Sequence, residues 1–157
     1  MRVIEKKVYR FDELADKAKE TARDYFRDLD YTRIDGSIQS IKTFCAAFNV
    51  SLLDYSVGAY LPFEYKTDAS VASFRGKRLS QFNRNHAPTG YCLDNTLWTT
   101  FYDVFKTTGD AECAFNKALD AGFKSWREAL EYQNTAEYSD EFILMNEYEF
   151  YEDGKLF

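Results

Sequence analysis

The stretch "RVIEKKVYRFDELADKAKETARDYFRDL", residues 2–29, contains two hydrophobic periods in succession and indicates the fold class. In residues 2–10, successive side chains would alternate between the two faces of a strand, and several of them are β-branched. This pattern is typical of a β-strand of about eight residues. From Asp12 onward, apolar side chains recur every three or four positions, so they share one face of a helix. These side chains are Leu14, Ala18, Ala22, Tyr25 and Leu29. A strand therefore passes into an amphipathic helix within one short segment.

Four later segments have the same helical period. We expect helices from about residue 34 to 48, from about 95 to 105, from 110 to about 130 and from 139 to 146. Asp110 and Ser139 can accept hydrogen bonds from the first backbone N–H groups of the last two helices. Asn146 tolerates the left-handed conformation and is expected to end the helix that begins at residue 139.

The segment between residues 51 and 76 is predicted to form two paired strands. The first covers residues 51–61 and the second residues 69–76, with the polar residues 64–68 as their connection. Alternation places four side chains of the first strand on one face: Leu53, Tyr55, Val57 and Ala59. Pro62 lacks a backbone donor and is expected to end this strand.

Together these elements predict an α+β fold in one domain, residues 1–157. We expect a small, mostly antiparallel sheet of about four strands, covered on one face by about four or five helices. The strand near the N-terminus and the closing segment are expected to lie in the same sheet.

The closing stretch "NEYEFYEDGKLF", residues 146–157, alternates aromatic and acidic side chains. Asp153-Gly154 is a favoured two-residue hairpin turn, so the stretch is predicted to form a strand and a hairpin. Tyr148 and Phe150 would face the core. The acids Glu147, Glu149, Glu152 and Asp153 would face solvent.

The charge of the chain is concentrated in this same region. The chain of 157 residues has a formal net charge of −6, which argues against non-specific binding to nucleic acids or to anionic membranes. Residues 139–157 carry Asp140, Glu141, Glu147, Glu149, Glu152 and Asp153 against Lys155. We therefore predict a partner-binding surface for a protein with a basic face, formed by Glu147, Glu149, Tyr151, Glu152 and Asp153.

A basic segment, residues 74–86, supports a different hypothesis. Its cations are Arg75, Lys77, Arg78 and Arg84, interleaved with Phe74, Phe82 and His86. Nucleic-acid grooves use cations for phosphates and aromatic rings for bases, so the alternative is a nucleic-acid-binding or antitoxin-like regulator that uses this segment. A loop whose charge is balanced by acidic neighbours is the simpler interpretation, and direct nucleic-acid binding is not expected in an acidic protein.

Catalytic, cofactor and metal signatures are missing from the sequence. Phosphate-binding glycine loops, H-E-x-x-H and G-x-S-x-G are absent, so we predict no enzyme and no cofactor. A single histidine and three widely spaced cysteines (Cys45, Cys92 and Cys113) do not predict a zinc site. The cysteines are interpreted as reduced and mostly buried, and a Cys92–His86 pair stays an alternative. No run approaches the roughly 18 apolar residues of a membrane span, so we expect a cytoplasmic protein.

The two ends of the chain resemble a family of small bacteriophage and prophage proteins, sometimes labelled antitoxin-like. The opening matches are Phe11, Asp12, Glu13, Leu14, Ala18, Lys19 and Ala22, and the closing ones are Asn146, Glu147, Tyr148, Phe150, Glu152, Asp153, Gly154 and Phe157. The resemblance implies a phage origin and an α+β fold, and it supplies no catalytic residues. It favours a phage accessory protein that, in the host cytoplasm, binds and inhibits a host protein, such as a nucleic-acid-targeting defence complex (an anti-CRISPR-type role).

Overall fold

The computed structural model describes residues 7–28, 34–68 and 85–157. Contacts between residues divide the chain into two compact units. The terminal unit consists of residues 1–31 and 132–157, and the central unit of residues 32–131. Each unit has its own hydrophobic core. A single domain would require the two units to pack together as one body. The single domain expected from the sequence therefore stays a prediction.

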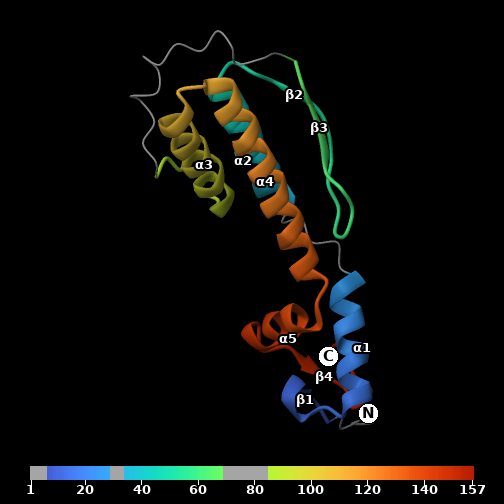
Figure 1. The fold of residues 1–157 in the computed structure, drawn as a ribbon. Coiled ribbons are helices and arrows are strands. Elements are labelled where there is room, and N and C mark those ends of the chain that lie inside the picture. The colour runs from blue at the N-terminus through green and yellow to red at the C-terminus, as the bar shows by residue number, and fades with distance from the viewer. Residues whose placement is uncertain (1–6, 29–33, 69–84) are drawn as a thin grey trace, which may run out of the picture. The chain divides into compact units, whose positions relative to one another are not determined.

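The terminal unit is built from both ends of the chain, the blue and the red segments of Figure 1. It contains β1 (Tyr9–Arg10), the 3-10 turn η1 (Phe11–Glu13), α1 (Asp16–Asp28), α5 (Ala136–Met145) and β4 (Glu149–Phe150). Strand β1 pairs antiparallel with β4, with Tyr9 opposite Phe150 and Arg10 opposite Glu149. The opening strand and the closing segment therefore share a sheet, as predicted. Residues 2–6 of the expected strand lie outside the described residues.

Helix α1 presents a stripe with a spacing of four residues to the core of the terminal unit. Leu14, Ala18, Ala22 and Phe26 are all buried along this stripe. The prediction had placed Tyr25 on this face, and it was wrong, because the spacing of four continues from Ala22 to Phe26 and leaves Tyr25 46% exposed. Leu29 lies outside the described residues. Among the described residues of this unit, the remaining buried core side chains are Phe11, Ile143 and Phe150.

A bidentate ion pair joins α1 to α5. The Arg23 Nε and Nη2 atoms donate to the two carboxylate oxygens of Asp140, at 2.6 and 2.7 Å. This fork-to-carboxylate geometry is the strongest arrangement that the two side chains can form. Hydrogen bonding to Asp140 raises the pKa of Arg23 above its ordinary value.

The ends of α5 differ from the prediction by a few residues. The N-terminal cap is Thr135, whose side chain accepts a hydrogen bond from the Tyr138 N–H, whereas Ser139 is buried inside the helix. Thr135 is also a cap-forming residue, and the helix simply begins one turn earlier than expected. Asn146 ends the helix as predicted, but with φ −94°. The left-handed residue is Glu147, with φ 53°.

The central unit contains three helices and a two-stranded ribbon among its described residues: α2 (Ile34–Ala47), α3 (Cys92–Thr108), α4 (Ala111–Gln133), β2 (Leu52–Ser56) and β3 (Glu64–Thr67). Gly109, with φ 69°, ends α3. Asp110 then caps α4 by accepting from the N–H groups of Glu112 and Cys113, which confirms its predicted role. The helices enclose a core rich in aromatic rings, including Phe44, Phe48, Trp98, Phe101, Phe115, Phe123 and Trp126.

The ribbon β2–β3 differs most from the prediction. Residues 64–67, expected to form a connection, are strand β3, and the expected partner strand 69–76 lies outside the described residues. Tyr65 on β3 stacks on Phe123 of α4, with ring centroids 4.9 Å apart and planes 4° apart. A bulge between Leu52 and Asp54 interrupts the alternation of β2. Leu52 and Val57 pack against the core, whereas Leu53 is 57% exposed. The predicted common face of this strand was therefore wrong at Leu53.

The described residues form two separate two-stranded antiparallel sheets, so the single sheet of about four strands was a wrong prediction. Each pair of strands has a different apolar surface to cover. Phe150 of β4 packs against Phe11 and Phe26 in the terminal unit, whereas Tyr65 of β3 packs on α4 in the central unit. The α+β class is confirmed, with five α-helices in the described part of the chain. None of the helices described there is both long enough and apolar enough to cross a membrane.

Candidate functional site

The closing hairpin, residues 147–157, holds the acids that the sequence singled out. The Tyr151 N–H donates to the Lys155 carbonyl at 2.8 Å, and the Phe157 N–H donates to the Glu149 carbonyl at 2.9 Å. The loop between Tyr151 and Lys155 has three residues and ends on Gly154, whose φ is 84°. A three-residue loop with a left-handed glycine last is a common hairpin connection, so the expected two-residue turn is corrected to this one.

The hairpin separates its aromatic and acidic side chains as predicted. Phe150 is fully buried and Tyr148 is half-buried. Glu147, Glu149, Glu152 and Asp153 are all exposed. Tyr151 was expected on the outer face and is half-buried, with its ring centroid 5.5 Å from that of Phe157.

The acids of the hairpin differ in the cations beside them. Asp153 pairs with Lys155 at 2.8 Å, and hydrogen bonding between the two lowers the pKa of Asp153 and raises that of Lys155. Glu149 lies opposite Arg10 on the neighbouring strand. Within the described residues, Glu147 and Glu152 take part in no ion pair. Among the described residues, Glu147 and Glu152 are therefore the hairpin carboxylates without an ion-pair partner, although Lys7 and Lys155 line the same hollow as Glu152.

Large apolar side chains are exposed on the same unit, and the sequence reasoning missed them. At the end of α5, Leu144 is 52% and Met145 is 82% exposed, and Phe157 at the end of the hairpin is 65% exposed. The signal was the run "FILM", residues 142–145, because four consecutive apolar side chains on a helix cannot all face one core. Exposed apolar groups surrounded by charge are typical of interaction surfaces.

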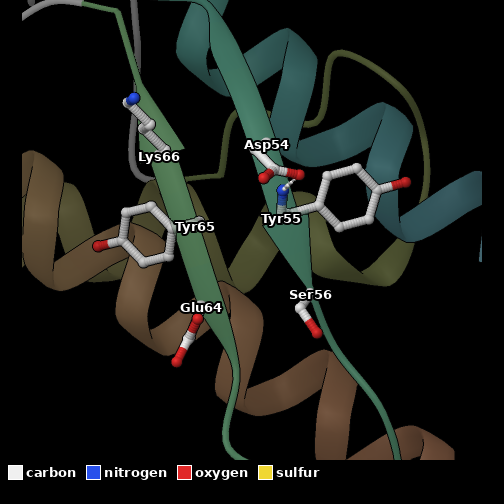
Figure 2. A pocket seen from close by; sticks show the side chains of 6 residues that line it. All are labelled: Asp54, Tyr55, Ser56, Glu64, Tyr65 and Lys66. Atoms are coloured by element: carbon white, nitrogen blue, oxygen red, sulfur yellow. Dashed lines mark hydrogen bonds between the residues drawn. The ribbon is translucent and has the colours of Figure 1, made fainter.

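A hollow of about 170 Å³ lies on the ribbon β2–β3 in the central unit. Figure 2 shows its six lining side chains spread along the two strands rather than converging on a point. Asp54 accepts from the Tyr55 N–H, and the Tyr65 hydroxyl donates to Asp120, so both groups have structural partners. Burial, followed by the bond to Asp120, raises the pKa of Tyr65.

The cysteines occupy three different environments. Cys45 is buried, Cys113 is half-buried and Cys92 is exposed, so the prediction of mostly buried thiols holds only for Cys45. Burial raises the pKa of the Cys45 thiol to about 12. In the part of the chain that the structure describes, no three Cys, His, Asp or Glu side chains are grouped to hold a metal ion.

The four cations of the basic segment, Arg75, Lys77, Arg78 and Arg84, lie outside the described residues. His86, the last residue of the segment, is described and packs edge-on against the Trp98 ring, with centroids 4.8 Å apart. The nucleic-acid hypothesis stays a prediction.

Comparison with other proteins adds no relative: no protein family matches the chain, and neither does any curated protein or solved structure.

Proposed function

We propose that this chain is a phage accessory protein that binds a basic surface of a host protein through its terminal unit and inhibits it. The host protein belongs, in this proposal, to a nucleic-acid-targeting defence complex, whose lysine- and arginine-lined channel offers such a surface. The observation that carries the proposal is the combination of exposed acids (Glu147, Glu149 and Glu152) with exposed Leu144 and Met145 on one compact unit.

The two kinds of side chain have different effects on binding. Carboxylates raise the association rate with a basic partner and fix its orientation, and salt screens their effect. Apolar anchors supply most of the affinity when they become buried in the complex. A surface with both is suited to rapid and specific docking, whereas acids alone would give only weak, salt-sensitive attraction.

The test is capture of a host protein from bacterial lysate with three forms of the chain. The wild type is compared with the double reversal Glu149→Lys with Glu152→Lys. The matched control, Glu64→Lys with Glu128→Lys, changes the net charge equally but on exposed positions of the central unit. We expect the wild type and the control to retain one host protein that the hairpin variant loses.

The captured protein is then assayed for nucleic-acid binding or cleavage with and without the chain. Inhibition by the wild type and by the control, but not by the hairpin variant, supports the proposal. Equal loss in both variants would show that only the total charge matters. Capture of no specific protein at any ionic strength would refute the proposal.

A further inference from the structure

A hollow of about 150 Å³ lies in the terminal unit, between η1 and the end of α5. Its buried lining comes from Phe11 and Ile143, which are 5% and 0% exposed. Leu144, 52% exposed, and the half-buried Tyr148 add further apolar surface. The volume is well below the roughly 300–1,000 Å³ of pockets that hold small-molecule ligands, so the hollow fits a single side chain.

Three charged residues complete the lining: Arg10, Asp12 and Glu147. All three are exposed, and two carboxylates against one guanidinium give a negative balance. Within the described residues, neither Asp12 nor Glu147 forms an ion pair. Two cations lie near the Phe11 ring. The Arg23 guanidinium, 5.7 Å from the ring centroid, is matched by Asp140, and Lys19 Nζ lies 5.9 Å from the centroid. The hollow therefore combines apolar walls with two carboxylates that form no ion pair among the described residues.

We infer that this hollow receives one arginine or lysine side chain of the basic partner. The methylene stem would lie against Phe11, Ile143 and Leu144, and the charged end would lie near Asp12 and Glu147. Long cationic side chains bury their stems on apolar surface while their charged ends stay in a polar environment, which is the division that this hollow offers. A neutral apolar side chain would desolvate the carboxylates without compensation. This inference rests on the proposed function and names the group that anchors its partner.

The backbone at Glu147 allows a sharp test. Its φ of 53° is unfavourable for a residue with a side chain and is natural for glycine. Glu147→Gly therefore removes the carboxylate while it relieves the backbone, so loss of binding cannot be attributed to unfolding. Glu147→Gln keeps the size of the side chain and removes only its charge. Glu137→Gln is the matched control, because Glu137 is an exposed carboxylate of the same unit, outside the proposed binding surface, and does not line the hollow.

The probe is the capped tripeptide Gly-Arg-Gly, titrated into the whole chain and followed by NMR of the backbone amides. The comparison peptide has citrulline, the uncharged analogue of arginine, at its centre. We expect weak, saturable shifts confined to residues 10–12 and 143–148 with the arginine peptide. Affinity should fall about two- to fivefold in Glu147→Gln, which is the range for a partly exposed ion pair. Glu147→Gly should weaken binding without lowering the melting temperature, and Glu137→Gln should leave binding unchanged.

Equal shifts with the citrulline peptide, shifts outside these residues, or unchanged affinity in Glu147→Gln would each overturn the inference. The titration needs no host protein, so it is independent of the capture experiment. Failure of the titration with successful capture would remove the hollow as an anchor and keep the hairpin surface. A positive titration with failed capture would keep the cation site and remove the host-docking role.

Discussion

Gly154 of the closing hairpin lies directly against the backbone carbonyl of Ala18 in α1. A Cβ atom on Gly154 would overlap the Ala18 oxygen and would lie 2.8 Å from the Ala18 carbonyl carbon and 3.0 Å from its Cα. Gly154 and Ala18 are both buried. The hairpin turn therefore packs directly on the backbone of α1. This contact fixes the orientation of the acidic side chains of the hairpin.

We predict that Gly154→Ala strongly destabilises the terminal unit. A side chain at φ 84° is strained, because this left-handed conformation favours glycine. The new Cβ would also clash with the Ala18 carbonyl oxygen, a backbone atom held in place by helix α1. The expected loss of unfolding free energy is about 2–5 kcal/mol. Hydrogen exchange of the α1 amides measures it, because both tryptophans, Trp98 and Trp126, lie in the central unit and their fluorescence does not report on α1.

The control for this prediction is Gly109→Ala. Gly109 has a similar φ of 69°, but a Cβ there would meet no atom within 4 Å. Only the backbone strain remains, so we expect a loss of about 1 kcal/mol. Equal effects at the two glycines would show that the contact with Ala18 is unimportant.

Gly122 in α4 supplies a prediction for the central unit. Alanine is favoured over glycine by about 1 kcal/mol inside a helix, but a Cβ here would lie 2.6 Å from Cδ2 of the fully buried Leu97. We expect Gly122→Ala to lower stability by about 1–2 kcal/mol despite its higher propensity, because overpacking outweighs the gain.

A double-mutant cycle with Leu97→Ala checks this account. Leu97→Ala alone should cost about 2–5 kcal/mol as a core truncation. In the double variant the new methyl group occupies space that Leu97 has left, so the combined loss should be smaller than the sum of the two. Denaturant unfolding followed by tryptophan fluorescence gives all three values. Simple additivity would contradict the proposed contact.

The closing hairpin should separate stability from binding. Phe150→Ala removes a fully buried ring and is expected to cost about 3–5 kcal/mol. The double reversal Glu149→Lys with Glu152→Lys should cost less than about 1 kcal/mol, mostly because residue 149 would then face Arg10 with the same charge. It should nevertheless slow association with the partner, and the wild-type rate should fall as salt increases. If the double reversal leaves inhibition intact, the hairpin only completes its small sheet.

Cys45 predicts how the central unit responds to alkaline pH. Its folded pKa of about 12 lies above that of an unfolded thiol, near 8.5. The unfolded chain therefore loses this proton first, and stability that is present below about pH 8.5 is lost as pH rises towards 12. The midpoint of urea unfolding should fall over this range, and it should fall less in Cys45→Ala. A thiol reagent at pH 8 should modify the exposed Cys92 quickly and Cys45 only after unfolding.

The sequence predicted the features that depend on local period and on capping. The inward stripe of α1 through Ala22, the Asp110 cap and the buried Phe150 follow from such rules. Strand β3 was missed because Tyr65 alone of its four side chains packs on the core, and nothing in "EYKT" indicates that the Phe123 ring on another element lies beneath Tyr65. The glycines show the same difference: Gly154 was expected in a turn, but its contact with Ala18 joins segments that only the fold brings together.

The terminal unit combines residues 1–31 with residues 132–157, and this arrangement affects the order in which the chain can fold during synthesis. The central unit is continuous, residues 32–131, and all of its core residues are translated before the closing hairpin. Helix α1 must wait, because the rings that cover Phe26, those of Phe142, Tyr148 and Phe150, come from the far end of the chain. Until then Phe11 and Phe26 lack these partners in the nascent chain, and transiently exposed apolar surface of this kind is prone to aggregation. A ribosome that stalls after residue 131 would release a chain able to complete the central core and unable to form the surface proposed to bind the host.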